Sequence, residues 1–315
     1  MMTAAETYAA LVDAANAQRM RLRGEEVPGA RWDHEMAQRF RYDPHRSLDT
    51  NLDIIASYVE LQDVLIDVGG GAGRICLPLA LRCREGIVVD VSQAMEEAFQ
   101  ECVAAAGITN ARFIRADWLA AEELHGDIAV AASVTYFVRD IVAFVRKMEA
   151  AARRRVLLTV RSVPGPNLRA TLFRLVYGEE QLPSPGYREL LPVLWEMGIL
   201  PDVRVLPGPQ RGVSCSVDTD LPQTRDQAVE MALQGGWLRP EDRKRARGVI
   251  EAHSDELFSE TPAGFRPLWH PATRELLITW ETDHKLRSGV GRAISQPKRA
   301  GRRGGAEPSH RGDDQ

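Results

Sequence analysis

The sequence of 315 residues predicts an α/β fold built on a doubly wound parallel sheet. Short segments of strand character alternate with helical patterns from residue 64 onward. The first segment, 64–68, runs directly into the glycine cluster 69–73, and a helical pattern follows it. Three successive segments end in a carboxylate, at Asp67, Asp90 and Asp117. Alternation at this spacing implies right-handed βαβ crossovers with helices on both faces of the sheet.

The expected elements follow one another along the chain without long gaps. Strands are expected over 64–68, 87–90, 111–117, 127–133, 155–161, 201–206 and 275–281. Helices are expected over 74–84, 92–107, 140–152, 168–177 and 187–197. Ser92 can cap the second of these helices because its hydroxyl can accept a hydrogen bond from a backbone N–H of the first turn.

Three regions are expected to differ from the sheet core. Residues 1–60 are predicted to form a helical N-terminal cap or lid, with helical segments over 3–20 and 32–40 and a third from Leu48. Residues 61–287 are predicted to form the sheet domain, with a charged helical insertion at about 220–262. Residues 288–315 are rich in Gly, Arg and Ser, so we expect a disordered tail.

The composition is that of an ordinary soluble protein. Hydrophobic residues make up 44% of the chain and the formal net charge is −4, which argues against nucleic acid as the main partner. No apolar run approaches the roughly 20 residues of a membrane span, and the N-terminus lacks the order of a secretion signal. The four cysteines show no CxxC or metal-binding spacing. We therefore expect a cytoplasmic protein without a metal site; the oligomeric state stays open.

The glycine cluster excludes two common ligand-binding motifs. A dinucleotide fingerprint needs a small residue at position 74 or 76, where Arg74 and Cys76 stand. A phosphate-binding P-loop needs a Gly-Lys-Ser/Thr ending, which is absent. The pattern present is acid-x-Gly-x-Gly-x-Gly, formed by Asp67, Gly69, Gly71 and Gly73. This pattern resembles motif I of the class I S-adenosylmethionine (SAM)-dependent methyltransferases.

The strand-end carboxylates suit the same ligand. In an open parallel sheet, ligands lie across the carboxyl ends of the strands. Asp90 lies about twenty residues past the glycines, where an acidic side chain can accept both ribose hydroxyls. Asp117 is one strand further out and is placed to accept from an adenine amino group. The apolar side chains expected to sandwich the ring are Val91, Met95 and Trp118.

The resemblance extends over residues 62–161, which look like the core of the class I methyltransferases in their small-molecule branch. The further matching blocks are 89–95, 116–118 and 133–140. The resemblance implies a Rossmann-like seven-stranded sheet of order 3-2-1-4-5-7-6 with an antiparallel last strand. It also implies that the α-amino and carboxylate ends of SAM lie on the loop 69–73 and on the backbone of Ser133.

The implied activity is methyl transfer to a small, moderately apolar acceptor, with O-, N- and C-methylation all open. Because the sulfonium is an activated donor, the enzyme mainly holds the reactants collinear and excludes water. A base is needed only if the acceptor must lose a proton. The candidate catalytic residues are Tyr136 and His34, with His270 as a third. Trp32 and Arg41 are expected in the lid, where Arg41 pairs either with the SAM carboxylate or with a surface carboxylate.

Two other functions remain open at this point. The first is a non-catalytic SAM-binding protein of the methyltransferase fold that acts as a regulator. The second is an NAD(P)-dependent oxidoreductase, against which the missing third glycine counts. Residues 133–136 read Ser-Val-Thr-Tyr where amino-group methyltransferases of nucleic acids or protein amides carry an Asn/Asp-Pro-Pro-aromatic block. Nucleic-acid bases are therefore unexpected as acceptors.

Overall fold

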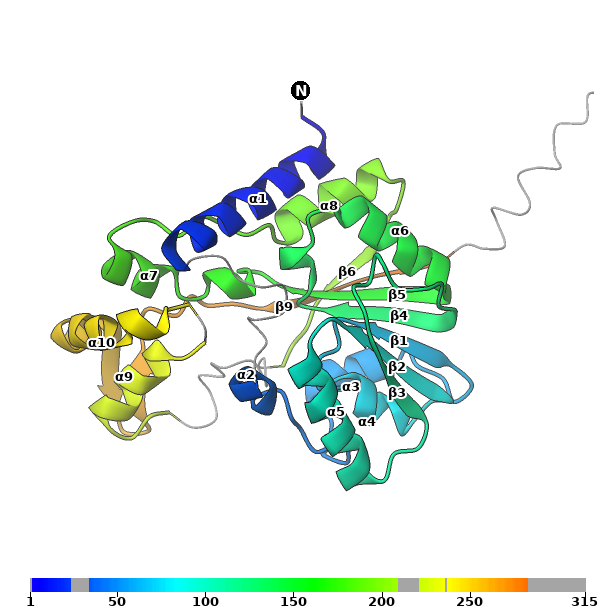
Figure 1. Ribbon diagram of the computed structural model, residues 1–315, viewed down its shortest axis with the longest axis horizontal. Coiled ribbons are helices and arrows are strands. Elements are labelled where there is room, and N and C mark those ends of the chain that lie inside the picture. The colour runs from blue at the N-terminus through cyan, green and yellow to red at the C-terminus, as the bar shows by residue number, and fades with distance from the viewer. Residues whose placement is uncertain (1, 24–33, 209–220, 236, 283–315) are drawn as a thin grey trace, which may run out of the picture. The chain divides into compact units, whose positions relative to one another are not determined.

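Seven strands form one mixed sheet in the computed structural model, which describes residues 2–23, 34–208, 221–235 and 237–282 (Figure 1). The strands are β1 (Val64–Val68), β2 (Glu85–Asp90), β3 (Ala111–Arg115), β4 (Gly126–Ala132), β5 (Ala152–Arg161), β6 (Asp202–Val205) and β9 (Glu275–Glu281). Their order is β3-β2-β1-β4-β5-β9-β6. Since β6 and β9 are the sixth and seventh strands of this sheet along the chain, the expected order 3-2-1-4-5-7-6 is confirmed. β9 runs antiparallel to both of its neighbours, as expected.

The parallel part of the sheet brings the strand ends to one edge. β1 lies between β2 and β4, with Ile66 opposite both Ile87 and Ala129. All five residues of β1 are buried, as expected for a central parallel strand covered on both faces. The residues that follow β1, β2 and β4 therefore emerge side by side at the carboxyl edge.

Helices cover both faces of the sheet, which confirms the doubly wound class. On one face lie α1 (Ala4–Arg23), α6 (Ile141–Ala151) and α8 (Tyr187–Glu196); on the other lie α3 (Thr50–Ala56), α4 (Cys76–Ala80) and α5 (Gln93–Ala106) (Figure 1). The alternation of side chains along β1 explains this division. Ile66 belongs to the same hydrophobic cluster as Tyr8 of α1, whereas Leu65 belongs to the cluster that contains Ile55 of α3.

The segment after the glycine cluster differs from the expected helix over 74–84. The helix is confined to α4, and the residues on either side of it form turns. Pro78 has no N–H, so it cannot donate to the Arg74 carbonyl four residues earlier. That carbonyl instead accepts from Nη2 of Arg46 at 2.7 Å. In the next helix the expected cap is present, because Ser92 Oγ accepts from the Met95 N–H at 3.2 Å.

A second group of elements packs around a core of its own. It contains α7 (Ala170–Tyr177), α9 (Arg225–Leu233), α10 (Arg243–Ala252), α11 (Ser254–Leu257) and the hairpin of β7 (Phe258–Thr261) with β8 (Gly264–Pro267). The expectation of helix up to residue 262 was wrong for β7. Phe258 is buried in this core while the strand pairs with β8, so tertiary packing decided the conformation.

The remaining short helices are α2 (His34–Gln38) and three 3₁₀ turns at Thr135–Phe137, Gly165–Asn167 and Pro240–Asp242. No helix within the described ranges has the length and apolar character needed to cross a membrane. Trp32 and the expected tail over 288–315 lie outside the described residues. The predicted boundaries of the cap and of the insertion stay predictions.

Candidate functional site

A cavity of about 580 Å³ opens at the carboxyl edge of the sheet. This volume is in the usual range for small-molecule sites. Its lining comes from the residues that follow β1, β2, β3, β4 and β5, together with α2, the segment 165–169 and Gly235. Of the predicted binding residues, the cavity lining contains Asp67, Gly69, Gly71, Asp90, Val91, Met95, Asp117, Trp118 and Ser133.

The glycine loop is held against the tip of β2. The Gly69 N–H donates to the Val89 carbonyl at 2.7 Å, and the Gly71 N–H donates to Oδ2 of Asp90 at 3.1 Å. Gly69 and Gly71 have φ values of 68° and 54°, which side chains other than glycine rarely adopt. A Cβ atom at Gly69 would lie 2.6 Å from Val134 Cγ2. Glycine is thus required both by the turn and by the close approach of β4.

Asp67 lies beneath this loop and is almost fully buried. Its Oδ2 accepts from the Cys76 N–H at 3.2 Å, and a Cβ atom at Gly70 would lie 2.6 Å from its Cγ. Burial raises the pKa of Asp67 to about 7, against the opposing effects of the Arg74 charge and the Cys76 N–H. A nearby positive charge would favour the ionised form.

Asp90 connects the loop to the start of α5. Its Oδ2 accepts from Gly71, and its Oδ1 accepts from the Ser92 N–H at 2.9 Å. Burial raises the pKa of Asp90, and these two N–H groups partly oppose that effect. Each carboxylate oxygen has two lone pairs, so both can accept a further hydrogen bond from the cavity.

The predicted ring-binding residues surround one end of the cavity. Trp118 is buried, and its Nε1–H donates to the Phe144 carbonyl at 3.3 Å. Met95 is buried next to the loop, with its Sδ 3.3 Å from where a Cβ of Gly71 would lie. Val91 is 46% exposed. Asp117 is exposed, and its Oδ1 accepts from the Leu119 N–H at 2.8 Å, which leaves Oδ2 for a ligand.

Gly73 is the predicted loop residue that does not line the cavity. Its φ is 81°, and a Cβ atom there would lie 2.6 Å from Leu77 Cγ and 2.9 Å from Phe99 Cδ2. Gly73 therefore allows α4 and α5 to pack closely behind the loop.

The tip of β4 carries Ser133 and Tyr136. Ser133 has a φ of 60°, and its N–H donates to the Thr159 carbonyl at 2.8 Å. The Tyr136 hydroxyl accepts from the Arg161 N–H at 2.5 Å. Burial raises the pKa of Tyr136 to about 12, so this phenol stays protonated at neutral pH.

The candidate histidines and Arg41 lie outside the cavity lining. His34 is exposed on α2, with Nε2 3.4 Å from Nε2 of Gln38. Nδ1 of His270 lies 2.9 Å from the Pro271 carbonyl, and burial, followed by the charges of two nearby arginines, lowers its pKa. Arg41 forms an ion pair with Glu101 at 2.7 Å, the second of its two expected roles.

Several lining residues were not predicted from the sequence. They are Met36, Arg39 and Phe40 near α2, Arg74 after the loop, and Arg161, Arg169 and Gly235 at the far end. Arg161 ends β5 as Asp90 ends β2, so the strand-end rule could have found it. Arg169 and Gly235 come from two distant segments, and no sequence pattern predicts that these segments are in contact. Among the described residues, no group of three or more His, Cys, Asp and Glu side chains could hold a metal ion.

Comparison with known proteins places a family match on the same part of the chain. Residues 65–155 match a family model described as "Methyltransferase domain". No sequence among the curated proteins matches this chain.

Three solved structures to which the chain is similar are the following. A SAM-dependent methyltransferase from Thiobacillus denitrificans, in complex with S-adenosyl-L-homocysteine, is 12% identical with a TM-score of 0.49, over 81% of this chain and 98% of that chain. A SAM-dependent methyltransferase from Geobacter sulfurreducens, also in complex with S-adenosyl-L-homocysteine, is 13% identical with a TM-score of 0.46, over 77% of this chain and 96% of that chain. The YcgJ protein from Bacillus subtilis is 17% identical with a TM-score of 0.46, over 73% of this chain and 97% of that chain.

Proposed function

We propose that this chain, whose residues 65–155 match the family model of a methyltransferase domain, is a class I enzyme that transfers a methyl group from SAM to a small acceptor. The observation that carries the proposal is the hydrogen bond between the Gly71 N–H and the Asp90 carboxylate at the cavity wall. It fixes a main-chain loop and an acidic side chain in one place. A nucleoside with a charged amino-acid tail needs both.

The charges of the lining fit SAM better than a dinucleotide. SAM brings a sulfonium and an α-ammonium, and the lining at this end offers the carboxylates of Asp67, Asp90 and Asp117. A pyrophosphate would meet the same carboxylates with like charge, which is unfavourable. Arg74 directly follows the loop and lines the cavity, so it is suited to the α-carboxylate of the ligand.

The side chains of this protein bind and orient the two reactants and do not need to activate the methyl donor. When bound, the sulfonium supplies a methyl group that is already electrophilic. Asp90 holds the ribose, Trp118 and Met95 contact the adenine, and the apolar side chains of Phe137 and Leu168 exclude water. Tyr136 keeps its proton at neutral pH, so it donates a hydrogen bond to the acceptor instead of removing a proton.

Calorimetry and turnover together test this function. The purified full-length protein is titrated with SAM, S-adenosylhomocysteine and NADH, and methyl-labelled SAM is then incubated with a panel of small acceptors. We expect binding of SAM and its product, no binding of NADH, and label on one class of acceptor. Binding without turnover on any acceptor would favour the regulatory alternative. Binding of NADH alone would contradict the proposal.

A further inference from the structure

One edge of the sheet is formed by β6, the outermost strand next to β9 (Figure 1). All four residues of β6 are exposed. In the part of the chain that the structure describes, no strand pairs with the outer side of β6. An uncovered edge presents unpaired backbone groups to a further strand, so proteins either shield such an edge or use it for association.

The backbone of β6 has hydrogen-bonding groups for a further strand. The Leu206 N–H donates to the Glu275 carbonyl at 2.8 Å, and the register of β6 with β9 continues from there without a break. Hydrogen-bonded pairs alternate along an antiparallel ladder, so the N–H and C=O groups of Val203 and Val205 point away from β9. A strand that pairs with the outer side of β6 therefore meets these two residues.

The side chains on one face of this edge are apolar. Val203 lies opposite Ile278 of β9, which belongs to the hydrophobic cluster on the face that α8 covers. Val203 and Val205 are 45% and 58% exposed on this face. Two further exposed apolar side chains lie close by in the chain, Trp195 near the end of α8 and Leu200 just before β6. An apolar surface therefore borders the edge.

The other face of β6 carries two opposite charges. Asp202 and Arg204 are both exposed, and within the described ranges neither side chain forms an ion pair or a hydrogen bond. The strand at the opposite edge of the sheet differs, because Arg112 of β3 pairs with Glu85 of β2 at 2.7 Å. The two charges of β6 are therefore available to a partner.

These features make β6 complementary to itself. Around a two-fold axis through Val203, two antiparallel copies of β6 bring Asp202 of each copy opposite Arg204 of the other. The N–H and C=O groups of Val203 then pair with those of Val203 in the second copy, and the Val205 N–H meets the Pro201 carbonyl. The two charge pairs fall at non-hydrogen-bonded positions, where facing side chains are closest.

The neighbouring registers are less favourable. An axis through Arg204 would place the two arginines opposite each other, and like charges at such positions are destabilising. An axis through Val205 would place Arg204 opposite Leu206 and leave its charge without a partner. Pro201 and Pro207 lack an N–H, so they prevent the ladder from extending beyond the strand. The charges and the prolines thus select the axis through Val203.

We propose that a second copy of this chain binds at β6, so that the two sheets join into one continuous sheet around the axis through Val203. Both copies use the same edge, so the contact closes on itself and assembly stops at the dimer. Two ion pairs between Asp202 and Arg204 secure one face of the contact. On the α8 face, Val203 packs against Val203 of the second copy, flanked by Val205 of each copy.

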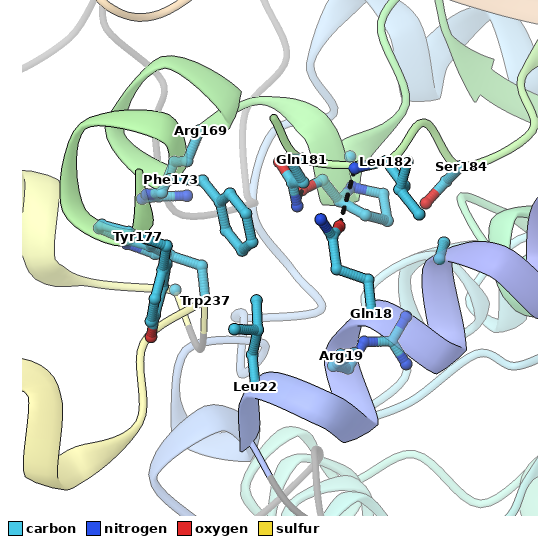
Figure 2. Close-up of a pocket in the computed structure, with 14 residues that line it drawn as sticks. Gln18, Arg19, Leu22, Arg169, Phe173, Tyr177, Gln181, Leu182, Ser184 and Trp237 are labelled. Carbon is cyan, nitrogen blue, oxygen red and sulfur yellow. Dashed lines mark hydrogen bonds between the residues drawn. The ribbon is translucent and has the colours of Figure 1, made fainter. Parts of the chain in front are cut away.

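The proposed interface is separate from the functional site. A small chamber of about 70 Å³ lies between α1 and α7, and Figure 2 shows the residues that line it. Among the described residues, those of β6 line neither this chamber nor the main cavity. The dimer therefore does not depend on the proposed methyl transfer, and each can be tested without the other.

Sedimentation velocity of the full-length protein over a range of concentrations tests for the dimer. We expect a species with twice the mass of one chain, which dissociates on dilution. A monomer at every concentration, the result expected if another part of the same chain covered β6, would overturn the proposal.

The charge variants Asp202→Arg and Arg204→Asp test the register. Each substitution alone places like charges opposite each other at both positions, so we expect the dissociation constant of the dimer to rise at least tenfold. A mixture of the two variants should form a dimer with an affinity within threefold of wild type, because two arginines of one chain then face two aspartates of the other. Unchanged dimers of the single variants, or a mixture that stays monomeric, would overturn the proposal.

Arg112→Asp is the matched control, because Arg112 is 50% exposed in β3, the strand at the opposite edge. Its dissociation constant should stay within twofold of wild type. Circular dichroism shows whether each variant is folded. Should a charge variant not fold, Val203→Lys decides, since two lysines would then meet on the axis. We expect this variant to weaken the dimer at least tenfold, and an unchanged dimer would overturn the proposal.

Discussion

At the scale of single residues, Asp90 joins the loop to the cavity. Its two oxygens hold the N–H groups of Gly71 and Ser92, so one side chain positions both the glycine turn and the start of α5. Asp90 also lines the cavity in which SAM is proposed to bind. A change at Asp90 is therefore expected to act on cofactor binding in two ways: by removing the proposed acceptors for the ribose and by releasing the loop.

Asp90→Ala should weaken the binding of S-adenosylhomocysteine by about 1–3 kcal/mol, the usual cost of leaving polar groups unpaired, or roughly 5- to 150-fold in Kd. Isothermal titration calorimetry of both proteins at the same salt concentration measures this difference in affinity. Asp53→Ala is the control, because Asp53 is 69% exposed on α3. Equal affinities of Asp90→Ala and wild type would show that the ribose lies elsewhere.

The variant Asp67→Asn tests whether the buried carboxyl group under the loop is protonated in the folded protein. Burial raises the pKa of Asp67 to about 7, so the folded protein holds a proton that the unfolded chain loses near pH 4. The wild type therefore loses stability as pH rises from about 4 to about 7. Asn carries no charge, so the stability of Asp67→Asn relative to wild type should increase over this range by on the order of 2–4 kcal/mol.

Urea unfolding of the ligand-free proteins at pH 5, 6, 7 and 8 measures this difference. Asp127→Asn is the contrasting control. Partial burial opposes ionisation of Asp127, but the Val64 N–H and Arg153 outweigh it and lower the pKa. Its contribution to stability is lost only as pH falls through the acid range, so its difference from wild type should stay constant from pH 5 to 8. A flat profile for Asp67→Asn as well would show that Asp67 is ionised throughout.

At the scale of elements, the loop and α4 form a unit that depends on glycine at position 73. The chain must turn with positive φ there and still bring Leu77 and Phe99 into contact behind the loop. The positive φ at Gly73 keeps this residue out of the helix, so α4 begins only at Cys76.

Gly73→Ala should lower the free energy of unfolding by about 1–3 kcal/mol more than Gly107→Ala does. Both glycines have positive φ, so alanine is strained at either position by roughly 1 kcal/mol. At Gly73 the new Cβ also overlaps Leu77 and Phe99, whereas at Gly107 no atom lies within 4 Å. Urea denaturation compares the free energies of unfolding. Equal losses would mean that the neighbours of Gly73 move aside without cost.

The elements of the sheet could be predicted from the sequence because their cause is local. Each parallel strand is a short apolar run followed by a turn residue, and the carboxyl ends of such strands always share an edge. Asp90, Trp118 and Ser133 are expected at one edge of the sheet for this reason, and all three line the cavity there. The strand β7 has no such local cause, since its pairing with β8 and the burial of Phe258 depend on partners distant from the strand itself.

At the scale of the whole molecule, the site is completed by segments far from the glycine loop. The Tyr8 hydroxyl of α1 donates to the Thr135 carbonyl at 2.7 Å, which ties the N-terminal helix to the tip of β4. Tyr8 is fully buried, a contribution of about 1.5–3 kcal/mol for a side chain of this size. Gly235, near the end of α9, packs on Arg169 at the start of α7.

The far end of the site could not be predicted for this reason. Arg169 has no distinctive neighbours in the sequence, and its position depends on Trp269 and Gly235, which arrive from other parts of the chain. The candidate base Tyr136 was found by its place after β4, but its raised pKa follows from burial that only the packed structure reveals. His34 stays a prediction, and it lies outside the cavity lining.

A crystal structure of the full-length protein with S-adenosylhomocysteine tests the central claim most directly. We predict the nucleoside across the ends of β1, β2 and β3, with both ribose hydroxyls on Asp90, the adenine beside Trp118 and the amino-acid tail on the loop 69–73. Density for the ligand at another place on the protein, or a ribose turned away from Asp90, would contradict the account.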